Sequence, residues 1–418
     1  MRIAVIGSGI SGVVCAHELC SQHDVVLYEA RPRLGGHTNT AVVDENGRSV
    51  AVDTGFIVFN EKTYPNFVAL LRELGVDWVE SDMSFSVSST ARDFEYNGHN
   101  LSTLFSQRRH LVSPRFYRMV FDIMRFYRQA PRLLGEEGEV PLLSWLEVNG
   151  YSRAFIDDHM IPMVRALWST TRDGAARFPA RFLVRFFDNH GFLQVENRPT
   201  WLTVAGGSHR YLQAFAARFR GRLRLATPVR SVRRRSDGRL DVSCDGETTA
   251  YDHVIFACHS DQALRSLEAP KAVETQVLGA IPYQRNEVLL HTDSSVMPRL
   301  RRSWASWNVH LDDEGVDGAC LTYWMNSLQP LDTTTNYFVT LNHSQAVAPE
   351  RVIRRETYYH PIFTPESVAA QARHAELIDN AGISYCGAYF RNGFHEDGVV
   401  SAKRVVAQLR RRHVEVAA

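Results

Sequence analysis

The sequence predicts an α/β protein in which helices cover a parallel sheet. Residues 3–6 are an apolar run, as in a buried parallel strand. Gly7, Gly9 and Gly12 follow with the spacing G-x-G-x-x-G, and a helical pattern opens near Ser11. A second apolar run, residues 24–28, ends on Glu29. This order of strand, turn, helix and strand predicts a Rossmann-like domain that binds a dinucleotide.

Each part of this stretch has a physical purpose. Gly7 lets the chain turn off the strand, Gly9 leaves room for a pyrophosphate, and Gly12 lets the helix pack closely. The N-terminus of the helix, with Ser11, presents free N–H groups to phosphate oxygens. We expect the carboxylate of Glu29 to accept hydrogen bonds from ribose hydroxyls.

The overall composition excludes several classes of protein. With 418 residues and a net charge of +1, the chain is long enough for two domains and has no global field that favours nucleic acid. Its six cysteines form no C-x-x-C pair, so we expect no metal site, no disulfide framework and a cytoplasmic location. The apolar start is too short for a signal peptide, and no transmembrane segment is visible.

A second glycine pair follows the predicted ribose ligand. Gly35 and Gly36 lie within residues 31–38, RPRLGGHT, and an NAD fingerprint has no such pair. It indicates a longer cofactor whose pyrophosphate and ribityl chain continue past the first turn. Arg31 or Arg33 beside a 2′-phosphate would indicate NADP instead, but Glu29 would repel that group.

The middle of the chain is helical and basic. A helix is predicted from Thr63, as its N-cap, to Leu74. Residues 104–134 are mostly helical, and residues 108–132 hold seven arginines against one acidic residue, Asp122, with aromatic residues between them. The functional interpretation is a surface that lies on anionic lipid or receives an acyl head group. The alternative is an ordinary solvated helix with a core-facing stripe.

Short β-runs dominate the second half of the chain. They are predicted at residues 222–226, 229–234, 240–244 and 253–257, and again with many aromatics at 288–291, 304–309, 320–324 and 337–341. The aromatic group is expected to line an apolar substrate channel, with ordinary core packing as the alternative: Trp304, Trp307, Tyr323, Trp324, Met325 and Phe338.

With these motifs in place, the sequence resembles the flavin-containing amine oxidase and phytoene desaturase superfamily. The runs DTGFIVFNEKTYPN, SDMSFSVS, NHGFL, GGSHRYL and GFHEDG resemble a bacterial branch of FAD-dependent oxidoreductases associated with cyclopropane-fatty-acid synthases. The resemblance implies a glutathione-reductase-like FAD-binding domain and a discontinuous α+β substrate domain, as in amine oxidases. The FAD-binding domain would comprise residues 1–79, 201–270 and 371–418. Residues 80–200 would form a mainly helical region, and residues 271–370 the substrate-domain sheet.

The fingerprint and the resemblance together imply a set of FAD-binding residues gathered from both ends of the chain. Capping of the C-terminal helix is a competing explanation for Glu396. The set is Gly7, Gly9, Ser11, Gly12, Glu29, Ala30, Arg31, Gly35, Gly36, His37, Thr38, Gly55, Phe56, Ile57, Val229, Gly387, Ala388, Phe394, His395 and Glu396.

The resemblance also implies catalytic candidates. Phe394 resembles a position that faces the flavin ring, and Tyr359 and His360 lie where the other face is usually lined. His360, and after it His395, are candidates for a general acid or base because histidine titrates near neutrality, with a structural histidine as the alternative.

Three departures from the superfamily pattern bear on the reaction. His37 replaces a usual arginine, Ala388 replaces a frequent acid, and no lysine lies between residues 272 and 402. Many amine oxidases hold a water near the flavin N5 with a lysine there, so its absence disfavours amine oxidation.

We therefore expect an FAD-dependent oxidoreductase that transfers a hydride from a substrate C–H to flavin N5. The substrate would be an apolar, fatty-acyl or related lipid, and the reaction desaturation, oxidation or a redox-neutral isomerisation. One alternative is an amine or amino-acid oxidase; another is a non-catalytic flavoprotein partner of a lipid-modifying methyltransferase. Nucleic acid is not an expected partner. On the functional interpretation of the basic region, helices 108–132 make peripheral contact with an anionic membrane.

Overall fold

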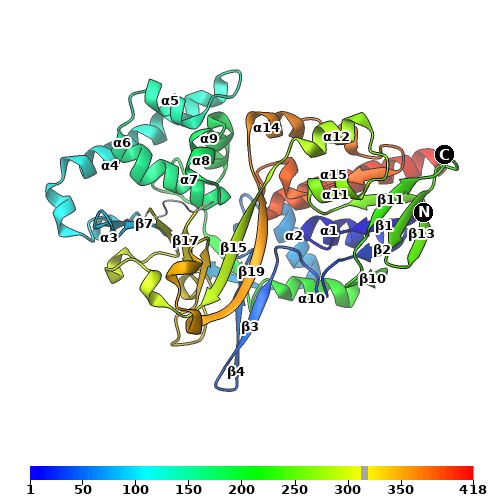
Figure 1. Cartoon of the computed structure of the whole chain (residues 1–418), viewed down its shortest axis with the longest axis horizontal. Coiled ribbons are helices and arrows are strands. Elements are labelled where there is room, and N and C mark those ends of the chain that lie inside the picture. Colours follow the sequence, from blue (N-terminus) through cyan, green and yellow to red (C-terminus); the bar gives the residue numbers. More distant parts are fainter. Residues whose placement is uncertain (312–318, 418) are drawn as a thin grey trace.

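A parallel sheet forms the centre of one half of the protein (Figure 1). The computed structural model describes residues 1–311 and 319–417. The sheet has the order β10-β2-β1-β14-β20, and all of its neighbouring strands are parallel. Its strands are β1 (Arg2–Ile6), β2 (Asp24–Tyr28), β10 (Arg222–Arg224), β14 (His253–Phe256) and β20 (Ile383–Tyr385).

Alternate residues of β1 enter two different apolar cores, because side chains alternate across a strand. Ile3 and Val5 lie in the core shared with helices α1 (Ile10–Leu19), α2 (Pro65–Leu74), α10 (His209–Arg218) and α15 (His395–Ala417). Ala4 and Ile6 lie in the core on the other face. That face is covered by β11 (Ser231–Arg234), β12 (Leu240–Cys244), β13 (Glu247–Tyr251), α11 (Ser260–Ser266) and α12 (Ala272–Gly279).

A largely antiparallel sheet forms the second layer of strands. Its order is β19-β15-β18-β17-β16-β7-β8, with β16 and β7 parallel. The long pair β15 and β19 runs between the two halves of the protein (Figure 1). The strands are β7 (Phe85–Ser89), β8 (Phe94–Asn97), β15 (Tyr283–His291), β16 (Trp307–His310), β17 (Leu321–Trp324), β18 (Phe338–Leu341) and β19 (Val352–Pro361).

Smaller elements join the two layers. They are the hairpin β3 (Thr40–Glu45) and β4 (Arg48–Asp53), the strands β5 (Val58–Phe59), β6 (Trp78–Ser81) and β9 (Trp201–Val204), and helices α13 (Met325–Leu328) and α14 (Pro365–Gln371).

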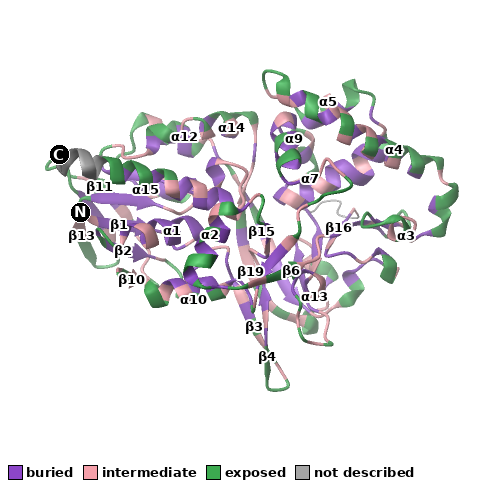
Figure 2. Cartoon of the chain, turned by 180° about the vertical axis from the view of Figure 1, so that it is seen from behind, coloured by how far each residue is buried: buried purple, intermediate pink, exposed green. Residues whose placement is uncertain are grey.

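A group of helices packs at the end of the molecule away from the parallel sheet (Figure 1). Their buried sides face one another around an aromatic core that includes Phe126, Phe155, Trp168 and Phe186 (Figure 2). The helices are α3 (Leu101–Leu104), α4 (Pro114–Gln129), α5 (Leu142–Val148), α6 (Arg153–Phe155), α7 (Ile161–Trp168), α8 (Arg172–Ala176) and α9 (Ala180–Asn189).

The expected α/β fold around a parallel sheet is confirmed, and several boundaries differ. The expected helical region 80–200 is helical only from residue 101, because β7 and β8 pair into the antiparallel sheet. Helix α2 begins at Pro65, since the backbone N–H and hydroxyl of Thr63 both donate to the Asn60 side chain. Within the described residues, no helix combines the length and apolar character needed to cross a bilayer.

Candidate functional site

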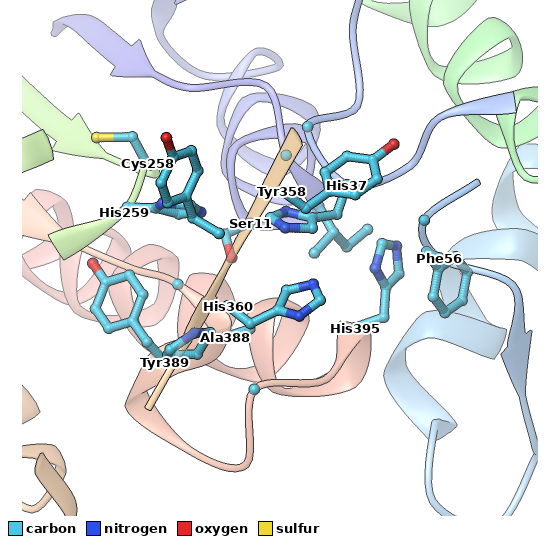
Figure 3. A pocket seen from close by; sticks show the side chains of 18 of the residues that line it. Ser11, His37, Phe56, Cys258, His259, Tyr358, His360, Ala388, Tyr389 and His395 are labelled. Carbon is cyan, nitrogen blue, oxygen red and sulfur yellow. The ribbon is translucent and has the colours of Figure 1, made fainter. Parts of the chain in front are cut away.

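A cavity of about 840 Å³ opens at the carboxyl ends of β1, β2, β14 and β20. Ligands of open α/β sheets bind at this edge. The cavity continues between helices α7 and α9 and the strands β15 to β19, which also contribute to its lining. Figure 3 shows the rings of His37, His360 and His395 around it.

The first glycine turn fits a pyrophosphate. Gly7 adopts φ +103°, and a Cβ there would lie 2.8 Å from the carbonyl oxygen of Ala257. A Cβ on Gly12 would overlap the carbonyl oxygen of Gly7, so Gly12 serves helix packing and lies outside the cavity lining. A Cβ on Gly9 would meet nothing within 4 Å. Packing therefore does not require glycine at position 9, and the open space faces the cavity.

The second glycine pair packs directly against the first turn. The Gly35 N–H donates to the Ser8 carbonyl at 3.1 Å, and a Cβ on Gly36 would lie 3.2 Å from the Gly9 Cα. The Arg33 guanidinium donates to the carbonyl oxygens of Leu34, Thr38 and Gly36. Arg33 thus holds the shape of this loop instead of contacting a 2′-phosphate.

Glu29 lines the nucleotide end of the cavity. Its carboxylate accepts hydrogen bonds from the Ser8 N–H and hydroxyl and from the Arg31 N–H. Two carboxylate oxygens can accept about four hydrogen bonds, so Glu29 retains capacity for a ribose hydroxyl. Val229 and Ala30 line the same end.

Neutral imidazoles gather in the middle of the cavity. The His37 ring lies 5.1 Å from the Tyr358 ring, 5.4 Å from that of His360 and 5.7 Å from that of His259, centroid to centroid. Burial, with the neighbouring His360 and His259, holds the pKa of His37 well below its usual value. The His37 Nε2 is buried with no hydrogen-bond partner among the described residues, which leaves a polar atom available to a cofactor.

The tautomer of His360 follows from its neighbours. Asn286 accepts at Oδ1 from the Asn342 amide and donates from Nδ2 to the Gln284 carbonyl, so its Nδ2 is the donor to His360 Nδ1 at 3.3 Å. The proton of His360 is therefore on Nε2. Burial, and then His259, lower the pKa of His360 to about 4. His360 is thus a neutral hydrogen-bond donor toward the cavity, which narrows the expected role of general acid or base.

The start of α15 contributes Phe394 and His395. The His395 ring stacks on Phe56 at 3.7 Å, and its Nε2 lies 3.0 Å from the Tyr211 hydroxyl. Burial lowers the pKa of His395 to about 3, so this ring is also neutral. Phe394 stacks on Phe186 of α9 at 4.8 Å, which joins α15 to the helical region.

Most predicted site residues line the cavity, whereas Gly12, Thr38 and Glu396 do not. The Thr38 hydroxyl bonds to the Tyr211 hydroxyl at 2.6 Å. Glu396 accepts from the Asn66 and Phe67 N–H groups, so it caps helix α2. The lining includes Gly7, Gly9, Ser11, Glu29, Ala30, Arg31, Gly35, Gly36, His37, Gly55, Phe56, Ile57, Val229, Gly387, Ala388, Tyr359, His360, Phe394 and His395.

Only part of the expected aromatic channel faces the cavity. Trp307 and Tyr323 line it, whereas Trp324 pairs with Phe338 across the neighbouring strands and contacts Trp304. Adjacent residues of a strand point to opposite faces, so Tyr323 and Trp324 cannot both face the cavity. Trp304, Trp324, Met325 and Phe338 therefore pack elsewhere.

Sequence reasoning missed several residues of the site. His259 and Gln262 follow β14, and the rule that ligands meet the carboxyl ends of parallel strands would have indicated them. Leu167, Trp168, Phe186 and Phe192 come from the helical region, and no local motif marks them.

Comparison with known proteins identifies the family. The model of the flavin containing amine oxidoreductase family matches residues 10–286. The chain belongs to the flavin-containing amine oxidoreductase family. It is also 26% identical over 410 residues to a carotenoid phi-ring synthase of Streptomyces griseus, covering 90% of this chain and 75% of that protein. This confirms the predicted superfamily; the branch within it stays a prediction.

Solved structures of other proteins share the fold of this chain. Cyclohexylamine oxidase from Brevibacterium oxydans IH-35A has a TM-score of 0.72 at 15% identity, over 98% of this chain and 99% of that one. A CLA-producing fatty acid isomerase from P. acnes has a TM-score of 0.71 at 15% identity, over 97% and 98% of the two chains.

Family membership makes this protein an FAD-dependent oxidoreductase. The residues present fit that cofactor at three places: the open space at Gly9, the two facing glycine turns, and the unpartnered Nε2 of His37.

Proposed function

We propose that this FAD-dependent oxidoreductase acts at a C–H bond of an apolar lipid, a fatty-acyl chain or a related molecule. The reaction would be desaturation, oxidation or a redox-neutral isomerisation. The supporting observation is the contrast between the two ends of the cavity. Charged side chains of the lining come from the nucleotide end: Glu29, Arg31, Arg230 and Arg265.

At the other end, the described lining residues of α7, α9, β16, β17 and β18 are apolar, apart from the Tyr323 hydroxyl and the indole N–H groups of Trp168 and Trp307. The polar lining residues of the antiparallel sheet come from β15 and β19, nearer the middle of the cavity: Tyr283, Thr357, Tyr358, Tyr359 and His360. The lining of the apolar end includes Met83, Leu167, Trp168, Phe186, Phe192, Trp201, Val288, Trp307, Leu341 and Phe363. Each methylene buried there contributes about 0.8 kcal/mol, so a long chain would gain affinity without any charged contact.

The chain's own side chains would exclude water and orient this substrate. When bound, FAD supplies a ring that accepts a hydride equivalent. His360 offers an Nε2 proton and Tyr323 a hydroxyl, which suits a weakly polar group on an otherwise apolar molecule. Tyr359, partly exposed on β19, lies at the rim. The names of the carotenoid phi-ring synthase and the fatty acid isomerase refer to apolar compounds, which supports the proposal.

An amine substrate would need a different lining. An ammonium group is bound by a carboxylate or by an aromatic cage. No Asp or Glu lines the apolar end within the described part of the chain, and Phe394 and Phe186 stack on each other instead of facing across a gap. Amine oxidation is therefore the second candidate, supported by the family alone.

Flavin absorbance under anaerobic conditions tests the proposal. Monounsaturated, methylated and cyclopropanated acyl lipids are expected to bleach the flavin or to be isomerised, whereas a panel of amines leaves both flavin and lipid unchanged. Leu167→Trp narrows the apolar end and is expected to slow the lipid reaction with FAD still bound. The control Leu225→Trp changes an exposed residue outside the lining and leaves the rate unchanged.

Two outcomes would reject the proposal. Bleaching by amines alone would identify an amine oxidase. No reaction with either class, in protein that keeps its FAD, would support a non-catalytic flavoprotein partner of a lipid-modifying methyltransferase.

A further inference from the structure

We propose that the outward face of α4 and the turn before it dock on an anionic phospholipid bilayer. This α4 surface consists of Leu111, Val112, Tyr117, Phe121 and Met124 with the arginines Arg108, Arg128 and Arg132. It lies on the helical group, at the opposite end of the molecule from the parallel sheet (Figure 1).

Helix α4 has apolar side chains on both of its faces. Its inward side buries Phe116, Met119 and Phe126. Tyr117, Phe121 and Met124 follow at i, i+4 and i+7 on the outward side, and 49%, 52% and 42% of their surfaces are exposed. The outward stripe of a surface helix is normally polar. A contiguous exposed apolar patch of this kind marks an interaction surface.

The turn before α4 extends the apolar patch. Leu111 and Val112 end the short turn Arg108–Val112, just before the N-cap Ser113, and Val112 is 82% exposed. An amphipathic surface of this type inserts its apolar side chains at the boundary between head groups and acyl chains.

Unpaired positive charge surrounds these side chains. Arg109, Arg115 and Arg118 form ion pairs with Asp93, Asp158 and Asp122. In contrast, Arg108, Arg128 and Arg132 form no ion pair with any residue that the structure describes. Their charge is thus available to lipid phosphates, and the combination of apolar and cationic side chains fits an anionic bilayer better than a neutral partner.

A hollow of about 320 Å³ beside the patch offers a place for a head-group phosphate. Arg92, Arg109 and Arg115 line it with a single acidic residue, Asp158, and exposed Val112 forms part of its wall. His110 also lines it; this residue is buried, and its Nδ1 has no hydrogen-bond partner among the described residues. Burial, and then Arg109, lower the pKa of His110 to about 4, so the ring is neutral and the arginines supply the positive charge that suits an anionic oxygen.

The same helix supports the active-site cavity. Phe126 of α4 belongs to the aromatic core that contains Trp168 and Phe186, and both of those residues line the cavity. Docking by α4 would therefore hold the wall of the lipid-binding end at the membrane, a consequence that rests on the proposed function. The docking itself does not depend on it.

Sedimentation of the full-length FAD-loaded protein with vesicles tests the inference. We expect binding to phosphatidylcholine vesicles that contain phosphatidylglycerol, weaker binding at high salt, and no binding to phosphatidylcholine alone. Phe121→Ser with Met124→Ser should lower the affinity roughly ten-fold or more. Arg128→Gln with Arg132→Gln should lower it by roughly five-fold for each charge, the factor that about 1 kcal/mol gives.

Matched variants distinguish a specific role of the α4 surface in vesicle binding from the effect of changing charge anywhere on the protein. Val112→Asp places a negative charge in the patch and should abolish binding, whereas Val42→Asp, on the exposed side of β3, should not. Arg220→Glu reverses an exposed arginine near α10 and should bind as the unchanged protein does. All these residues lie outside the cavity, so FAD absorbance and thermal stability report intact folding.

Three results would overturn the inference. The first is wild-type protein whose vesicle binding does not depend on phosphatidylglycerol, or variants of the α4 surface that bind vesicles as well as the wild-type protein does. The second is binding of soluble glycerol 1-phosphate without any vesicle binding, which would make the hollow a free-phosphate site. The third is a dimer that Phe121→Ser dissociates, which would make the face a contact between copies of this chain.

Discussion

Gly9→Ala should separate cofactor binding from folding stability. The residue precedes α1 as its N-cap with φ −62°, which alanine adopts freely, and the added Cβ would meet nothing within 4 Å. Less freedom in the unfolded chain stabilises the variant by about 0.4–1 kcal/mol. The poorer N-cap costs about 0.5–1 kcal/mol. These terms cancel, so the melting temperature of the apoprotein should change by less than about 2 °C.

The affinity for FAD should fall in the same variant. The methyl group occupies the open space in which the pyrophosphate approaches the backbone, and we expect the dissociation constant to rise roughly ten-fold or more, about 1.4 kcal/mol. Quenching of flavin fluorescence on titration into apoprotein measures this constant.

Gly7→Ala is the matched control with the opposite stability result. Its φ of +103° and the 2.8 Å approach of the Cβ to Ala257 O should destabilise the apoprotein by about 2 kcal/mol or more. Wild-type FAD affinity in Gly9→Ala, or a melting temperature as low as that of Gly7→Ala, would refute the assignment of the open space to the cofactor.

Further predictions concern the loop, the cavity and the histidines. Arg33→Lys should weaken FAD binding roughly ten-fold, because an ammonium cannot hold three carbonyl oxygens in the same fork, and fluorescence titration would detect it. Tyr323→Phe should leave FAD affinity unchanged and alter KM or kcat for the lipid; equal kinetics would remove Tyr323 from the substrate contacts. Burial lowers the pKa of His159, His190 and His374 to about 4, so the unfolded chain binds more protons below pH 6.5. The free energy of unfolding should therefore be highest above pH 6.5 and fall toward pH 4, by up to about 3 kcal/mol for each such histidine. Chemical denaturation at a series of pH values measures it. Burial raises the pKa of Asp53 and Asp397 to about 6, which opposes this trend, and stability that is constant or rises toward pH 4 would show that the histidines do not dominate.

The sequence predicted best those features of the fold and the site that depend on a few neighbouring residues. Positive φ at Gly7 and the close packing of Gly12 are properties of a few adjacent residues, and the spacing of the glycines indicates them directly. Glu396 was expected near the cofactor, but its partners Asn66 and Phe67 lie about 330 residues away, and no local pattern indicates them.

Strand alternation explains the errors in the aromatic channel. The sequence shows which aromatic residues share a face of β17 or β16, because faces alternate, but not which face looks into the cavity. Tyr323 and Trp324 illustrate this, since one lines the cavity and the other packs against Trp304. Which face of the strand lines the cavity depends on helices α7 and α9, which come from a distant part of the chain.

The assembly of the cofactor site from both ends of the chain sets the time at which FAD can be captured. Gly387, Phe394 and His395 are synthesised roughly 380 residues after Gly7 and Gly9. At about 5–20 residues per second, synthesis leaves these walls apart for roughly 20–80 s. The nascent parallel sheet has no β20 edge during that interval, so cofactor loading follows synthesis, and a cell short of FAD would accumulate full-length protein that awaits its ligand.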